Sequence, residues 1–340
     1  MLQQTQRIEQ TAGASAPAAA PPPPAAPWLG LGLNVQEAVD SRQAIALAGL
    51  DWQVDQWPIA VLPPSGAAPI AARSFVANVR TDTRGVLGIV TRKYQPFQNR
   101  DAFAFADAIV GEGHARYETA GALRGGRRVW MLLKLPGPLS AGMSDLIQPY
   151  LLVYNTFDGS SCLRALLTSI RVICQNSLNL ALATGRGEGI TVRHSGELAS
   201  RVDQARQTLG LVRKRLDHFA HEIRTFRRTA MTTERLEHYF QALLPELSGD
   251  AGERERANRR KALDALHANF ADPTNNLAGM RGSLWAALNA ATAFADHQRR
   301  FRGQDQQARA ENRLDSIWFG SGNDFKQAAY RSALELANLN

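Results

Sequence analysis

Arginines and amides recur at short intervals in the stretch RALLTSIRVICQ, which runs from residue 164 to residue 175. Arg164, Thr168, Arg171 and Gln175 stand three or four residues apart, which would place them along one side of a helix. Guanidinium, hydroxyl and amide groups suit the phosphates and base edges of nucleic acids. The solvated side of an ordinary helix is the alternative for this stripe, and Arg171 among apolar neighbours also fits a structural role.

A second group of cations surrounds a Gly-Gly dipeptide. Arg124, Arg127 and Arg128 flank the two glycines, and Trp130 follows in a β-rich run. A glycine pair between two such runs predicts a β-hairpin. A basic hairpin tip with an aromatic side chain nearby could follow a sugar–phosphate backbone and stack bases. An exposed turn made soluble by its charge is the alternative.

A third basic group is the pair Arg92 and Lys93, which precedes Tyr94, Pro96 and Phe97. Pro96 fixes an extended turn. Tyr94 and Phe97 fit core positions better than a stacking surface, whereas the basic pair could line a groove.

The linear sequence shows no catalytic constellation. His218 and His221 stand three apart, but the order H-E-x-x-H is absent, and Cys162 and Cys174 lie within apolar patterns. No phosphate-binding loop or nucleophile elbow is found in a strand–helix setting. We therefore expect no enzyme activity, no catalytic residues, no metal site and no cofactor. A hydrolase or nuclease would need carboxylates clustered around a cation, which the sequence does not display in linear form.

The charge balance favours an anionic partner. The chain has 340 residues, a formal net charge of +8 and two cysteines. Residues 84–174 hold 11 Lys and Arg against 6 Asp and Glu. The basic excess indicates nucleic acid, and the low cysteine count indicates a reducing cytoplasm. No apolar run is long enough for a membrane span, so no membrane partner is expected.

The periodicities predict an α+β protein, with an antiparallel sheet, helices packed on one face of it, and a mostly helical C-terminal region. We expect a disordered Ala/Pro-rich tail over residues 1–27, an α+β core domain over 28–195 and the helical region over 196–340. Helices are predicted near 35–48, 99–111 and 160–182. Strands are predicted on both sides of turns at 82–85 and 125–126, and before residue 158.

The stretch VYNTFDGSSCLRALLTSIRVICQNSLNLAL, residues 153–182, resembles the most recognisable motif of the phage/plasmid-like protein family, a domain of unknown function. The matching residues are Asp158, Gly159, Ser160, Arg171, Val172, Ile173, Cys174, Gln175 and Asn176. YQPFQN at 94–99, GSLWAALNAATAFADH at 282–297 and ENRLDSIWFGSG at 311–322 match as well. The resemblance spans residues 31–339 and implies a bacterial mobile-element protein.

The order of elements over residues 99–182 is also similar to that of Rad-type single-strand annealing recombinases. That resemblance implies an annealing-protein-like core, with the hairpin arginines and the arginines of the 160–182 helix lining a groove for single-stranded DNA. It also implies a homo-oligomer, which is a ring in proteins of that kind. The leading hypothesis is therefore a DNA-binding, strand-annealing protein of a phage or plasmid. A non-enzymatic regulatory or host-interaction protein, using the exposed charges at 254–261, is the alternative.

Overall fold

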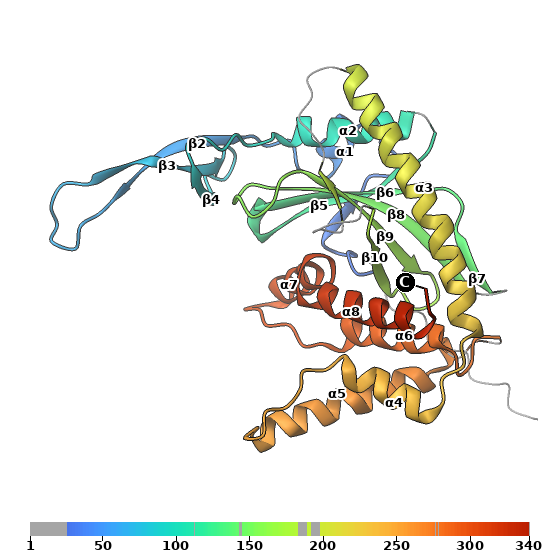
Figure 1. The fold of residues 1–340 in the computed structure, drawn as a ribbon. Helices are drawn as coiled ribbons and strands as arrows, with labels where there is room; N and C mark the ends of the chain where they lie inside the picture. Colours follow the sequence, from blue (N-terminus) through green and yellow to red (C-terminus); the bar gives the residue numbers. More distant parts are fainter. Residues whose placement is uncertain are drawn as a thin grey trace, which may run out of the picture.

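A computed structural model describes residues 26–111, 113–142, 145–182, 189–191, 198–275, 277 and 279–339. It contains two antiparallel sheets and a set of helices that dominates the C-terminal half (Figure 1). The α+β class and the helical C-terminal region are thus confirmed. The tail expected at 1–27 falls almost wholly outside the described residues, as does the expected boundary at 195–196.

The larger sheet forms the centre of the molecule, and every strand pair in it is antiparallel. Its strands, in spatial order, are β1 (Gly32–Asn34), β5 (Arg116–Leu123), β6 (Arg128–Lys134), β8 (Asp145–Thr156), β9 (Arg164–Arg171) and β10 (Ser177–Leu180). Two short strands join from the side: β7 (Leu139–Gly142) pairs with β8, and β11 (Ile190–Thr191) pairs with β9. The predicted hairpin around the Gly-Gly dipeptide is confirmed as β5 and β6.

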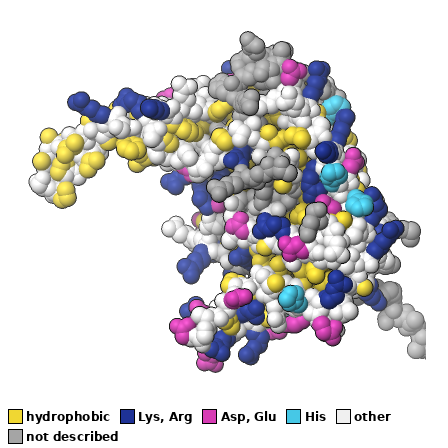
Figure 2. Space-filling model, in the orientation of Figure 1, with side chains coloured by type: hydrophobic (Ala, Val, Ile, Leu, Met, Phe, Trp, Pro, Cys, Tyr) yellow, Lys and Arg dark blue, Asp and Glu magenta, His cyan; other side chains and the backbone are white. Residues whose placement is uncertain are grey.

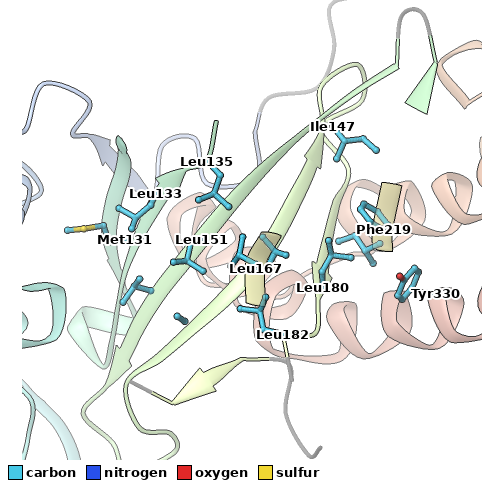
Figure 3. Close-up of a cluster of buried hydrophobic side chains, with 14 of the residues drawn as sticks. Met131, Leu133, Leu135, Ile147, Leu151, Leu167, Leu180, Leu182, Phe219 and Tyr330 are labelled. Atoms are coloured by element: carbon cyan, nitrogen blue, oxygen red, sulfur yellow. The ribbon is translucent and has the colours of Figure 1, made fainter. Parts of the chain in front are cut away.

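A row of leucines crosses the sheet and shows how the register is fixed. Leu133, Leu151, Leu167 and Leu180 are direct cross-strand neighbours on β6, β8, β9 and β10. All four are completely buried in the larger hydrophobic cluster (Figure 3). A slip of one residue would turn this whole row to the opposite face, so burial of the row specifies the pairing.

Helices cover both faces of the sheet, so the expectation of helices on one face alone is wrong. Helices α1 (Ser41–Leu47) and α2 (Asn99–Gly111) contribute to the same cluster as Leu151. Leu152, the next residue on β8, belongs to a second cluster with α7 (Gln306–Phe319). Successive strand residues point to opposite faces, so the two clusters lie on opposite sides of the sheet.

The predicted helix over residues 160–182 is also wrong, because this stretch forms β9, a turn and β10. A strand buried on both faces reads as a nearly continuous apolar run, and a short run of that kind does not distinguish helix from strand. As a strand, β9 directs Arg164 and Thr168 to one face and Arg171 to the other. The single polar stripe that the helical spacing predicted therefore does not exist.

A smaller sheet projects from the body as an arm, which we define as β2 (Val54–Val61), β3 (Ile70–Arg80) and β4 (Val86–Thr91) (Figure 1). The predicted turn at 82–85 joins β3 to β4. Side chains tie the base of the arm to the body: Asn78 Nδ2 donates to the Phe157 carbonyl at 2.7 Å. The side chain of Gln98 bonds both the amide and the carbonyl of Val54, at 2.9 and 3.0 Å.

The C-terminal half is built from long and short helices, some of which contact the sheet while others pack on those helices. They are α3 (Leu198–Arg228), α4 (Thr233–Ala242), α5 (Glu253–Ala271), α6 (Leu284–Ala293), α7 and α8 (Ser321–Leu336), with a π-helical turn at Phe294–Gln298. Residues from the expected core domain and from the expected helical region contribute to one continuous hydrophobic cluster.

Substituting Gly88, at the base of the arm, tests how the arm is seated. A Cβ at this position would lie 2.5 Å from the Asp158 Cα, which is too close for real atoms. Gly88→Ala must push the arm away from the 158–159 turn, and we expect it to lower the free energy of unfolding by about 1–3 kcal/mol. Gly111→Ala is the control, because a Cβ there meets nothing within 4 Å. If the two variants were equally stable in urea unfolding, the close contact between Gly88 of the arm and Asp158 would be contradicted.

Candidate nucleic-acid interface

Arg171, the central residue of the predicted polar stripe, is buried at the junction of the sheet and the C-terminal helices. Its Nε donates to Asp145 Oδ1 at 2.6 Å, and its other nitrogens donate to Asn275 Oδ1 and the Thr274 carbonyl, both at 2.7 Å. The second oxygen of Asp145 accepts from the Trp285 indole at 2.9 Å. Arg171 therefore holds β9, β8 and the segment before α6 together and is not available to a ligand on the surface.

A second buried ion pair lies where β10 meets α8. Lys326 Nζ donates to Asp296 Oδ1 at 2.7 Å, and both side chains are completely buried. Ser177 bridges them, since its amide and hydroxyl donate to Asp296 Oδ2 and its hydroxyl accepts from Lys326 at 2.6 Å. A buried charge is tolerated only when it is paired and hydrogen-bonded, and this triad satisfies both conditions.

His297, next to this triad, is held in one neutral form. Its Nδ1 lies 3.1 Å from the Arg313 guanidinium, which can only donate, so Nδ1 accepts. The proton therefore sits on Nε2, 3.1 Å from the Oδ1 of Asn176. Burial lowers the pKa of His297, the Asp296 carboxylate opposes that effect, and the Arg313 cation adds to it.

Two further residues of the predicted interface also lie inside the protein. Trp130 and Thr168 are both 0% exposed. Trp130 packs edge-on against Trp318 of α7, with ring centroids 5.1 Å apart. As the chain is folded, neither side chain can stack on or bond a polymer lying on the surface.

The hairpin-tip arginines are on the surface, but acidic side chains of α7 engage two of them. Arg124 and Arg128 both form ion pairs with Asp315, and the Arg124 amide donates to Glu311 at 2.9 Å. Arg128 also lies over the Phe319 ring at 4.2 Å. Arg127 is exposed. The tip thus carries less uncompensated positive charge than its sequence suggests.

The remaining predicted residues are scattered. Arg164 is partly buried on β9, opposite Tyr154 of β8. Gln175 lies in the turn between β9 and β10 and donates to the Val172 carbonyl at 2.8 Å. Arg92 and Lys93 are exposed at the end of the arm strand β4. The structure does not gather the ten predicted residues around one groove.

A different basic surface runs along α3, and the sequence patterns above did not single it out. The 31 residues of this helix hold eight Lys and Arg against three Asp and Glu. Its buried face repeats at intervals of three and four residues, through side chains such as Leu209, Val212 and Phe219. We define the α3 stripe as five exposed cations on the remaining surface: Arg206, Arg213, Lys214, Arg224 and Arg228.

The α3 stripe is long and carries little negative charge. At 1.5 Å per residue, it extends over roughly 33 Å from Arg206 to Arg228. Between Arg206 and Arg228, Asp217 is the one exposed acidic residue. The neighbouring His218 and His221 are exposed as well. Figure 2 shows Lys, Arg and His side chains following the edge of the molecule that α3 forms in Figure 1.

An open groove of about 330 Å³ lies beside the stripe. We call it the β5–β6 groove. Among the described residues, its lining combines two cations with apolar and small side chains; it consists of Gly113, Ala115, Arg116, Lys134, Leu135, Pro136, Gly137, Pro138 and Gln148. Arg116 and Lys134 are direct cross-strand neighbours, an unfavourable placement of like charges that a bound anion would relieve.

His114 connects the groove to the stripe. It stands between the lining residues Gly113 and Ala115, and its Nδ1 lies 3.2 Å from the guanidinium of Arg213 on α3. The groove and the stripe therefore form one basic surface made from the α2–β5 connection, the sheet and α3. The sequence signal for this basic surface was the composition of α3, which has eight Lys and Arg but three Asp and Glu.

Other kinds of site find little support in the described part of the chain. No three His, Cys, Asp or Glu side chains there group closely enough to hold a metal ion. None of the helices among those residues is both long and apolar enough to cross a membrane.

Comparison with family models gives one match, to a domain of unknown function named DUF932, over residues 86–318. The chain belongs to this family. Comparisons with curated proteins and with solved structures give no match. The DUF932 match covers β4 of the arm, the central sheet except β1, and most of the C-terminal helices.

The motifs that carried the sequence resemblance lie at junctions within this DUF932 protein. Asp158 forms a turn in which its Oδ1 accepts from the Ser160 amide at 2.9 Å, and this turn faces Gly88 of the arm. The Tyr94 hydroxyl donates to the Thr156 carbonyl at 2.8 Å. Asn176 donates to the Asn289 carbonyl of α6 at 3.1 Å. These residues join arm to sheet and sheet to helices, which gives them a structural role.

Replacing Arg171 should therefore reduce stability. In Arg171→Met the Asp145 carboxylate stays buried without its cation, and we expect a loss of about 3–5 kcal/mol in the free energy of unfolding. The exposed Arg127→Met is the control and should change it by no more than about 0.5 kcal/mol. Urea unfolding of both variants measures the difference. If Arg171→Met were as stable as the control, the structural role would be refuted.

His297 should make stability depend on pH in a defined window. The unfolded chain binds a proton at this side chain near pH 6.5, whereas the folded chain binds it only at lower pH because the pKa is lowered. Stability should therefore decrease as pH falls below about 6.5. His297→Gln should show a smaller decrease between pH 7.5 and 5.5 in urea unfolding, and the exposed His221→Gln should retain the parent's. Identical pH profiles for His297→Gln and the parent would contradict the assignment.

Proposed function

We propose that this DUF932 protein binds nucleic acid through the α3 stripe and the β5–β6 groove. The main support for this proposal is the line of exposed cations on α3. Between Arg206 and Arg228 the helix has a single exposed acidic residue. Such a line neutralises successive phosphates and releases their counterions, which is the main source of sequence-independent affinity. The net charge of +8 acts in the same direction.

Single-stranded DNA is the ligand that we favour. A volume of about 330 Å³ is that of a small-molecule pocket, so the groove can hold an unpaired nucleotide but not a duplex. Arg116 and Lys134 would meet a phosphate, and the apolar wall of Leu135, Pro136 and Pro138 would contact a base. The long helix beside the groove would then guide the rest of the strand.

Strand annealing in a phage or plasmid is the finer part of this proposal. Annealing needs no acid, base or metal; it needs neutralised phosphates and bases that remain accessible to a second strand. An exposed stripe that contacts only the backbone meets that requirement. The mobile-element setting comes from the sequence resemblance to phage- and plasmid-like proteins.

The α3 stripe can be tested by titrating binding with salt. Fluorescence anisotropy with single- and double-stranded oligonucleotides would compare the parent with Arg213→Ala/Lys214→Ala/Arg224→Ala. We expect weaker binding to all sequences and a slope of log K against log salt that is smaller by about 2, at about 0.7 per lost contact on a single strand. A FRET assay with complementary strands would report whether the parent accelerates annealing.

The α5 variant Arg254→Ala/Arg260→Ala/Lys261→Ala is the matched control, because it removes three exposed cations elsewhere. It should bind like the parent. If both triple variants lost the same amount of oligonucleotide affinity, binding would depend on net charge and not on the α3 stripe. A parent that binds no oligonucleotide would refute the proposed function and favour a host-interaction role. If the parent binds oligonucleotides but does not accelerate annealing, the annealing part of the proposal is refuted and the binding part stands.

A further inference from the structure

The arm exposes an apolar surface that the rest of the described chain leaves uncovered. We define the arm patch as Trp57, Val61, Leu62, Ile70, Phe75, Val86 and Ile89, which are between 46% and 75% exposed. These seven residues are almost half of the large hydrophobic side chains that are exposed among the described residues. Figure 2 shows hydrophobic side chains along the arm where it projects from the body.

The register of the arm shows why this face is open. Trp57 and Ile89 are the cross-strand neighbours of Ala77, and Phe75 is two residues before Ala77, so the three large side chains share one face. The opposite face is directed at the body, since Asn78 on it is 0% exposed and donates to the Phe157 carbonyl. One face of the arm therefore seats it on the body and the other is left for a partner.

A second exposed apolar surface lies near the N-terminal end of the described chain. We define the N-terminal patch as Leu29, Leu33, Val39 and Leu47, between 45% and 82% exposed. Leu33 lies on β1, an edge strand of the larger sheet, Leu29 and Val39 are close to β1 in sequence, and Leu47 ends α1. An edge strand with exposed apolar side chains is a template for association with another chain.

The two patches carry opposite charge. Residues 54–93, which include the arm, hold five Lys and Arg and two Asp. Residues 28–51, which include the N-terminal patch, hold Glu37, Asp40 and Asp51 against Arg42. All three carboxylates are on exposed residues. Two apolar surfaces surrounded by opposite charge are complementary both in apolar burial and in electrostatics, which together govern protein association.

We propose that the arm of one copy of this chain docks on the N-terminal patch of a second copy. The contact joins two different surfaces, so it is heterologous, and each copy offers one of each. Self-assembly by this route is independent of the nucleic-acid proposal, because the α3 stripe takes no part in it. Both patches lie largely before residue 86, where the DUF932 match begins.

The first experiment measures mass in solution, after nuclease treatment, by light scattering over a range of protein concentrations. We expect the parent to exceed the mass of one chain at micromolar concentration. Trp57→Glu/Phe75→Glu on the arm should weaken self-association roughly 100-fold or more, as expected when aromatic residues at the centre of an interface are lost. Val172→Glu/Leu247→Glu, which alters two exposed apolar residues elsewhere, should leave the parent's mass unchanged.

The second experiment mixes two variants that each lack one side of the contact. Leu33→Glu/Val39→Glu disables the N-terminal patch but keeps the arm. This variant and the arm variant should each be single chains alone, and their equimolar mixture should form a species of two chains and nothing larger. That outcome follows only if the arm of one meets the patch of the other.

Two results would overturn the proposal. In the first, the parent remains a single chain at all concentrations. In the second, the mixture of the two variants shows no species of two chains. Loss of oligonucleotide binding in the arm variant, together with a single-chain parent, would assign the arm to base stacking instead. Circular dichroism of each variant confirms that it is folded, which is expected because all four substituted side chains lie on the surface.

Discussion

Two ion pairs buried between the sheet and the C-terminal helices determine how this protein is assembled. Arg171 with Asp145 and Lys326 with Asp296 are closed off from water, so each charge depends on its partner and on the hydrogen bonds around the pair. Their partners come from β8, β9, β10 and the segments around α6 and α8. The helices therefore cannot leave the sheet without exposing unpaired charge to an apolar interior, and the two halves of the chain form one structure.

This assembly decides which surfaces remain for function. Because helices cover both faces of the central sheet, the described strands leave no broad open face on which a polymer could lie. What remains is the periphery: the outer side of α3, the β5–β6 groove at the end of the sheet, and the arm. The first two are basic and adjacent, which suits a phosphate backbone, whereas the arm is apolar on its free face, which suits a protein surface.

Much of the fold follows from the sequence, and the exceptions have one physical cause. The β5–β6 hairpin, the turn at 82–85 and the helix at 99–111 were predicted because turn residues or a clear helical period mark them. The stretch 160–182 was misassigned because β9 is buried on both faces and lacks the alternation of a half-exposed strand. That one error also produced the predicted stripe, since Arg164 and Arg171 share a side only in a helix.

The residues of the proposed interface were harder to predict, because a sequence shows charge but not its compensation. Arg124 and Arg128 looked free near the glycine pair, yet Asp315, almost 190 residues later, engages both. The cations of α3 are not a specific signal in the sequence, because a charged helix face is ordinarily a solvated one. Only the fold shows that Arg213 of α3 meets His114, which is next to the groove lined by Arg116 and Lys134. Positive charge from three separate segments of the chain is concentrated at this edge, and that is the physical reason to look for an anionic ligand there.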